Sequence, residues 1–123
     1  MPVILIVDDN GKNRKLARVV LGAAGFQTLE AETASDGIAL AAAHVPDVIL
    51  MDLRLPDLNG ADAARALARD ERTARIPVVA MSALPIDDHG WLASAGFAGS
   101  LEKPIRVESF PEQVRRFCTE PSR

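Results

Sequence analysis

Short, mostly apolar runs alternate with longer amphipathic stretches along the chain. The runs cover residues 3–7, 27–31, 48–51, 78–81 and, more weakly, 97–101. Runs one, three and four are apolar throughout, which is typical of strands covered on both faces of a parallel sheet. The stretches between the runs are long enough for crossover helices. The alternation predicts an α/β fold, with one doubly wound sheet of five parallel strands and five helices.

Capping residues and apolar spacing predict where the helices lie. The first helix should follow Asn10 and stop near Gly25. Its buried face should hold the apolar residues spaced at i, i+3, i+4 and i+7, which are Leu16, Val19, Val20 and Ala23. The other helices are expected over residues 33–45 and 59–70, over a short segment from about 85, and around Val114 and Phe117.

Polar side chains stand at the ends of four of the predicted strands. The first strand runs into Asp8 and Asp9, the third ends in Asp52, the fourth in Ser82 and the fifth in Lys103. Each residue alone has an ordinary explanation, such as a helix cap or a surface polar group. Ligands of open parallel sheets bind beyond the carboxyl ends of the strands, so the joint occurrence at four strand ends favours a functional site.

Composition narrows the class of protein. The 123 residues are 48% hydrophobic and 25% charged, which fits one folded domain with its own core. We expect a domain over residues 1–118 and a flexible tail over 119–123. The net charge of −3 argues against nucleic acid as a partner, and the first apolar run is too short for a signal peptide or a membrane span. Cys118 is the single cysteine, so no internal disulfide can form, which fits a reducing compartment. We therefore expect a soluble cytoplasmic protein.

Clustered carboxylates predict a cation. Three such groups repel one another unless a positive charge lies between them, and an all-oxygen set suits Mg²⁺ or Mn²⁺. Mg²⁺ prefers one or two carboxylates together with a phosphate oxygen, which points to phosphoryl chemistry at a further carboxylate. The Ser82 hydroxyl and the Lys103 ammonium could then share the charge of the phosphoryl oxygens.

Four segments together resemble a known family. ILIVDDN, VILMDLRLPDLNG, VVAMSA and LEKP are similar to the corresponding segments of the receiver domains of bacterial two-component response regulators, and the likeness covers residues 3 to about 118. The resemblance is to the stand-alone, chemotaxis-receiver-like type. It implies a flavodoxin-like strand order of 2-1-3-4-5. It also implies a protein that is not an enzyme but a phosphoacceptor in two-component phosphorelay signalling.

The resemblance assigns roles to the acidic residues. Asp52 would accept a phosphoryl group from a histidine kinase or a histidine phosphotransferase. Asp9 would bind Mg²⁺ directly, Asp8 would bind it through water, and the backbone carbonyl of Arg54 would be a further ligand.

It also assigns roles around the fifth strand. Ser82 would hydrogen-bond a phosphoryl oxygen, and Lys103 would pair with Asp52 or with its phosphate. A cis peptide bond would precede Pro104. The output face would comprise the fourth helix, the fifth strand and the fifth helix, including Trp91 and Glu102, and would contact an unidentified downstream protein. We expect no nucleic acid or membrane partner, and a monomer or weak dimer.

One position departs from the family pattern. The family usually carries Tyr or Phe three positions before the lysine, where this chain has Ser100. A receiver-fold interaction module that works without phosphate therefore remains an alternative. A phosphatase that forms an aspartyl-phosphate would need an acid two residues after its nucleophile, where this chain has Arg54. An FMN carrier is disfavoured because Asp8 and Asp9 would repel the phosphate.

Overall fold

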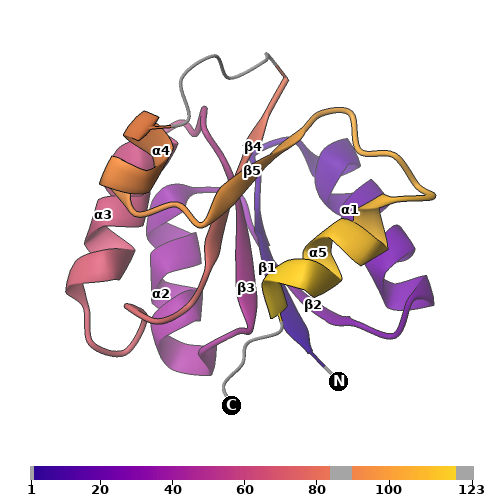
Figure 1. The fold of residues 1–123 in the computed structure, drawn as a ribbon, viewed down its shortest axis with the longest axis horizontal. Helices are drawn as coiled ribbons and strands as arrows, with labels where there is room; N and C mark the ends of the chain where they lie inside the picture. Colours follow the sequence, from indigo (N-terminus) through magenta and orange to yellow (C-terminus); the bar gives the residue numbers. More distant parts are fainter. Residues whose placement is uncertain (1, 84–89, 119–123) are drawn as a thin grey trace.

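The computed structural model describes residues 2–83 and 90–118, and its sheet has the strand order β2-β1-β3-β4-β5 (Figure 1). All of the pairs between neighbouring strands are parallel. The strands are β1 (Val3–Val7), β2 (Gln27–Ala31), β3 (Val48–Asp52), β4 (Val78–Ser82) and β5 (Gly99–Glu102). The helices are α1 (Gly11–Ala23), α2 (Ala34–His44), α3 (Gly60–Arg69), α4 (Gly90–Ala95) and α5 (Phe110–Cys118). The predicted fold and strand order are confirmed.

Helices cover both faces of the sheet (Figure 1). Helices α1 and α5 pack on one face, and α2, α3 and α4 pack on the other. Successive residues of a strand point to opposite faces, so Ile4 and Ile6 of β1 enter the α1/α5 core, while Leu5 and Val7 enter the other. This double burial is the reason why β1, β3 and β4 are apolar from end to end.

The predicted buried face of α1 was wrong by a rotation of about one residue. Leu16 and Val19 are 39% and 56% exposed. The residues that pack on the sheet are instead Ala17, Val20, Leu21 and, just after the helix, Ala24. This second set has the same i, i+3, i+4, i+7 spacing as the predicted one. Periodicity alone therefore could not choose between two neighbouring apolar stripes of the same helix.

The remaining boundaries differ little from expectation. Strand β5 begins at Gly99 rather than at 97, and α2 ends at His44, before Pro46. The predicted start of the fourth helix near 85 and the predicted tail at 119–123 lie outside the described residues. Within those residues, none of the helices combines the length and the apolarity that crossing a bilayer requires.

Gly60 brings α3 close to the end of β3. Its N–H donates to the carbonyl of Leu53 at 3.0 Å, and the Asn59 side chain caps the helix by accepting from the N–H of Asp62 at 2.8 Å. A Cβ at Gly60 would lie 2.9 Å from the Leu53 Cα and 3.0 Å from the Asp52 carbonyl oxygen. Glycine at this position therefore permits the backbone contact that fixes the segment just after Asp52.

We expect Gly60→Ala to lower the free energy of unfolding by about 1–3 kcal/mol, because the added methyl must push backbone atoms apart. Gly22→Ala is the matched control. Gly22 is an exposed position of α1 where a Cβ would meet nothing within 4 Å, so alanine should stabilise by about 0.5–1 kcal/mol. Urea denaturation of both variants measures these changes. A shift of the same sign in both would contradict this account.

Candidate functional site

The carboxyl ends of β1, β3 and β5 bring polar side chains to one edge of the sheet. Residues two apart in a strand point to the same face of the sheet. Asp8, Asp52 and Lys103 each follow by two residues a side chain that is buried under α1 and α5, so all three lie on that face. The buried residues are Ile6, Leu50 and Leu101. Carboxylate oxygens of Asp8, Asp9 and Asp52 all lie within 4.8 Å of one another. The structure thus brings together the acidic residues that the sequence singled out.

Lys103 lies between two of these carboxylates. Its Nζ donates to Asp8 Oδ2 at 2.8 Å and to Asp52 Oδ2 at 2.9 Å, and its side chain is only 15% exposed. Burial by itself would lower the pKa of the Lys103 ammonium, but the hydrogen bonds to Asp8 and Asp52 outweigh it and raise the pKa above its ordinary value. The lysine is therefore held charged, and it compensates part of the acidic cluster.

Asp8 is the buried member of the cluster. Its Oδ1 accepts from the Asn10 N–H at 2.9 Å, and its Oδ2 accepts from Asn13 Nδ2 at 3.3 Å as well as from Lys103. Asn10 also caps α1, accepting from the N–H groups of Lys12 and Asn13. The first turn of α1 therefore fixes the Asp8 carboxylate, and Asp8 enters the site with most of its hydrogen-bonding capacity used.

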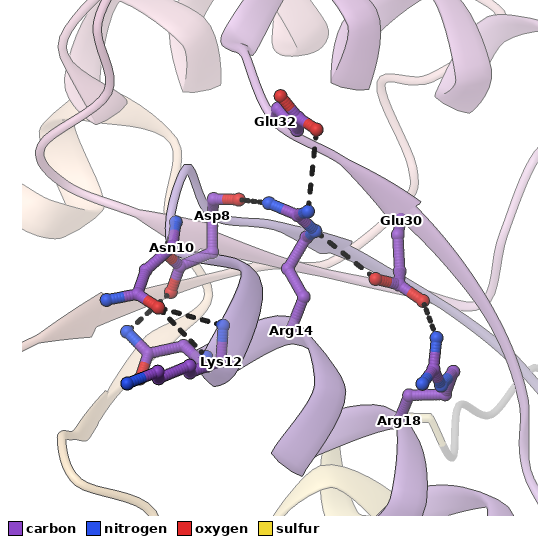
Figure 2. A network of polar contacts seen from close by, with 8 residues as sticks. Asp8, Asn10, Lys12, Arg14, Arg18, Glu30 and Glu32 are labelled. Atoms are coloured by element: carbon purple, nitrogen blue, oxygen red, sulfur yellow. Dashed lines mark hydrogen bonds and ion pairs between the residues drawn. The ribbon is translucent and has the colours of Figure 1, made fainter.

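The backbone of Asp8 is held by an arginine from α1 (Figure 2). Arg14 Nη1 donates to the Asp8 carbonyl at 2.7 Å, and the same guanidinium pairs with Glu30 at 3.2 Å and with Glu32 at 3.5 Å. Arg18 pairs with the other oxygen of Glu30 at 3.0 Å. Figure 2 shows Arg14 in the middle of this network, which ties α1 to the β2 side of the sheet. Arg14 therefore also compensates charge on Glu30 of β2 and on Glu32 just after it.

Asp9, Arg54 and Ser82 surround the same edge. Asp9 is exposed, and its carboxylate makes no hydrogen bond or ion pair within residues 2–83 and 90–118. The Arg54 N–H donates to Asp52 Oδ1 at 3.0 Å, and Arg54 forms an antiparallel bridge with Asn59. Ser82 is half-buried at the end of β4, and its carbonyl accepts from the Lys103 N–H at 2.8 Å.

The peptide bond between Lys103 and Pro104 is cis, as the resemblance implies. The residues expected on the output face lie in β5 and α4. Ser100 is half-buried in β5, Glu102 is exposed at its end, and Trp91 lies in α4. Because Glu102 is adjacent to Lys103 along the strand, it points away from the acidic cluster.

The chain matches one family model over nearly its whole length. The response regulator receiver domain model matches residues 4–115. Over 115 residues the chain is 34% identical to the polar-differentiation response regulator DivK of Brucella ovis, which covers 93% of this chain and 94% of that protein. The chain belongs to the response regulator receiver domain family, and it is a phosphoacceptor signalling protein of two-component systems. Membership of this family implies a histidine kinase as partner.

Solved structures of other proteins share the fold of this chain. The Vibrio cholerae chemotaxis protein CheY4 has a TM-score of 0.89 at 23% identity, covering 95% of this chain and 98% of its own, which shows the shared fold. The receiver domain of a sensor histidine kinase from Pseudomonas aeruginosa has a TM-score of 0.86 at 27% identity over 95% of this chain and 97% of its own. That structure has a magnesium ion coordinated in its active-site cleft. The acidic triad that could hold such an ion is present here.

Sequence reasoning missed Asp57, a residue of the loop between β3 and α3. Its Oδ1 accepts from the Ala34 N–H at 2.9 Å, and its Oδ2 accepts from the Ser35 N–H at 2.9 Å and from Ser35 Oγ at 2.7 Å. The bonds from the Ser35 hydroxyl, the Ser35 N–H and the Ala34 N–H lower the pKa of Asp57 from 3.8 to about 2. The sequence offered only a generic signal, an acidic residue in a turn.

Lys103→Met should lower the free energy of unfolding by about 2 kcal/mol in a buffer without divalent cations. The substitution leaves the buried Asp8 carboxylate facing Asp52 with no ammonium between them. Lys15→Met is the matched control, since Lys15 is exposed on α1 and has no ion pair in the described part of the chain. Urea denaturation compares the two, and equal effects would contradict the role given to Lys103.

The stability that Asp57 contributes should depend on pH. Because its pKa is lowered on folding, the ionised Asp57 stabilises the fold fully above the unfolded value of 3.8 and less as the pH falls toward about 2. The melting temperature of the wild type should therefore exceed that of Asp57→Asn by a constant amount above about pH 5. The difference should shrink below pH 3.8. Calorimetric scans at a series of pH values measure it, and a difference that grows on acidification would refute the assignment.

Proposed function

We propose that Asp52 is the residue that receives the phosphoryl group in this receiver domain. The observation that carries the proposal is the convergence of Asp8, Asp9 and Asp52 within 4.8 Å, with Lys103 bonded to both Asp8 and Asp52. Asp52 ends the central strand β3, and its carboxylate is 13% exposed, so it is partly shielded yet open to a donor at the edge of the sheet. A single carboxylate on the surface would lack both the cation-binding neighbours and the lysine.

The donor set fits a Mg²⁺ ion, or Mn²⁺ in its place. Three carboxylates and one ammonium leave two negative charges uncompensated, which is the charge that a divalent cation balances. Asp9 and Asp52 would hold the ion directly, and the Arg54 carbonyl would be a further oxygen ligand. Asp8, whose oxygens already accept three hydrogen bonds, would act through water. When bound, the ion would neutralise charge on the phosphoryl oxygens.

The residues of the chain perform the transfer. A carboxylate oxygen of Asp52 attacks the phosphorus of a phosphohistidine, and the new O–P bond forms as the P–N bond breaks. The electron pair of the broken bond goes to the imidazole nitrogen, which takes up a proton. Lys103, already bonded to Asp52, would shift toward a phosphoryl oxygen, and the Ser82 hydroxyl would donate to another.

Phosphorylation would then alter the face built from α4, β5 and α5. The phosphoryl group carries roughly −1.5 to −2 charges and replaces the single negative charge of the Asp52 carboxylate, so the contacts of Lys103 and Ser82 would change with it. A groove that includes Ser100, Glu102, Arg106, Ser109 and Gln113 lies beside Lys103 on this face. We infer that this groove contributes to binding a downstream protein.

We also infer that the phosphoryl donor is a histidine kinase or a histidine phosphotransferase. The domain would work in the cytoplasm as a monomer or weak dimer.

Incubation with acetyl phosphate and MgCl₂ should add one phosphoryl group to the wild type, detected by intact-protein mass spectrometry. Asp52→Asn should abolish the addition, because the amide is not a nucleophile, and a chelator should abolish it in the wild type. Asp62→Asn is the matched control, since Asp62 is an exposed aspartate of α3 that should not affect the reaction.

Two results would argue against the proposal. Modification of Asp52→Asn to the same extent as the wild type would place the acceptor elsewhere. A wild type that stays folded but takes up no phosphoryl group would favour the alternative, an interaction module of the same fold that works without phosphate.

A further inference from the structure

Asp57 links the loop after Asp52 to a helix that precedes it in the sequence. The three hydrogen bonds from Ala34 and Ser35 to the Asp57 carboxylate span more than twenty residues of sequence. Thr33 Oγ1 accepts from the Asp36 N–H, so Asp57 and Thr33 together satisfy the first three N–H groups of α2. A residue outside the helix thus completes its N-terminal cap.

The base of the same loop is also fixed. Arg54 and Asn59 form an antiparallel bridge, and the Gly60 N–H closes the loop on the Leu53 carbonyl. The Arg54 N–H is bonded to the Asp52 carboxylate at 3.0 Å. Asp57 lies three residues after Arg54, at the tip of the loop, where it is exposed to solvent. The contacts of Asp57 with α2 are therefore the polar anchor of the loop tip.

Helix α2 is in turn held against the strand that carries Asp8. Gly37 packs so closely on β1 that a Cβ there would lie 2.7 Å from the Val7 Cγ2. The Asp8 N–H donates to the carbonyl of Ala31 at 3.0 Å, shortly before α2 begins. The helix that anchors the loop tip is thus packed on the residue before Asp8. It therefore contacts both Val7, the residue before Asp8, and Asp57, in the loop that follows Asp52.

We propose that Asp57 is a positioning residue that holds the β3–α3 loop, and with it the Arg54 carbonyl, in the geometry that binds the divalent cation. The inference rests on the proposed function of the acidic pocket. Asp57 itself touches neither the cation nor the phosphoryl group. It acts by ordering the loop before the ion arrives, so that binding does not have to supply that order. Without these three hydrogen bonds the tip of the loop is released, and the Arg54 carbonyl is then held only by the contacts at the base of the loop.

The experiment measures the Mg²⁺ concentration that gives half-maximal phosphorylation by acetyl phosphate. For Asp57→Ala it should rise about tenfold, while the rate at saturating Mg²⁺ stays within about twofold of the wild type. Asp57→Asn keeps the shape and one acceptor oxygen, so its shift should be intermediate. This variant carries the test if Asp57→Ala does not fold. Titration calorimetry with MgCl₂ should give the same order of affinities.

Asp36→Ala is the matched control. Asp36 is an exposed carboxylate in the first turn of the same helix, and its side chain has no bond to the loop in the described structure. A Mg²⁺ requirement unchanged in Asp57→Ala, or raised equally in Asp36→Ala, would overturn the proposal, since the effect would then be absent or only one of helix stability.

A wild type that binds Mg²⁺ in the calorimeter but is not phosphorylated would refute the proposed function alone, and the calorimetric comparison would still decide the role of Asp57. A wild type that binds no Mg²⁺ would overturn both.

Discussion

Two ion pairs, from the ammonium of Lys103 to the carboxylates of Asp8 and Asp52, organise the acidic edge of the sheet. Three carboxylates within 4.8 Å of one another repel, and the ammonium among them offsets part of this repulsion. The lysine comes from the far edge of the sheet, so β1, β3 and β5 must all end at the same place. One lysine leaves the cluster negative, which suits a site that binds a divalent cation and then a phosphoryl group.

Support for this cluster comes from both layers of helices. On the α1 side, Asn13 bonds the Asp8 carboxylate and Arg14 bonds its carbonyl, while Arg14 also pairs with Glu30 and Glu32 (Figure 2). On the α2 side, Asp57 bonds the first turn of the helix. These residues do not belong to the acidic cluster itself. They restrict the backbone that presents it, which is how outer residues commonly determine the affinity of a metal site.

The same arrangement limits how a signal can leave the pocket. A phosphoryl group acts on distant residues only through contacts that differ between the two states of the protein. Under the proposed function Lys103 would provide such a contact, because its side chain bonds Asp52 while its backbone N–H bonds the Ser82 carbonyl across β4 and β5. Ser100 lies in β5 three residues before Lys103, on the opposite side of the strand from it. If phosphorylation acts as proposed, a small hydroxyl at this position in place of a ring would leave movement of Lys103 and β5 as the route to the α4, β5 and α5 face.

The α/β class, the elements and the polar residues at the strand ends could be predicted from the sequence, because these depend on local spacing and on the burial of whole strands. The predicted buried face of α1 was wrong, because the predicted residues have the same spacing as those that pack on the sheet, which are Ala17, Val20, Leu21 and Ala24. The tertiary structure distinguished the two sets, because it showed how α1 packs on the sheet. It also revealed the bond of Asp57 to α2 and that of Arg14 to Asp8, because contacts between residues far apart in the chain leave no periodic pattern in the sequence.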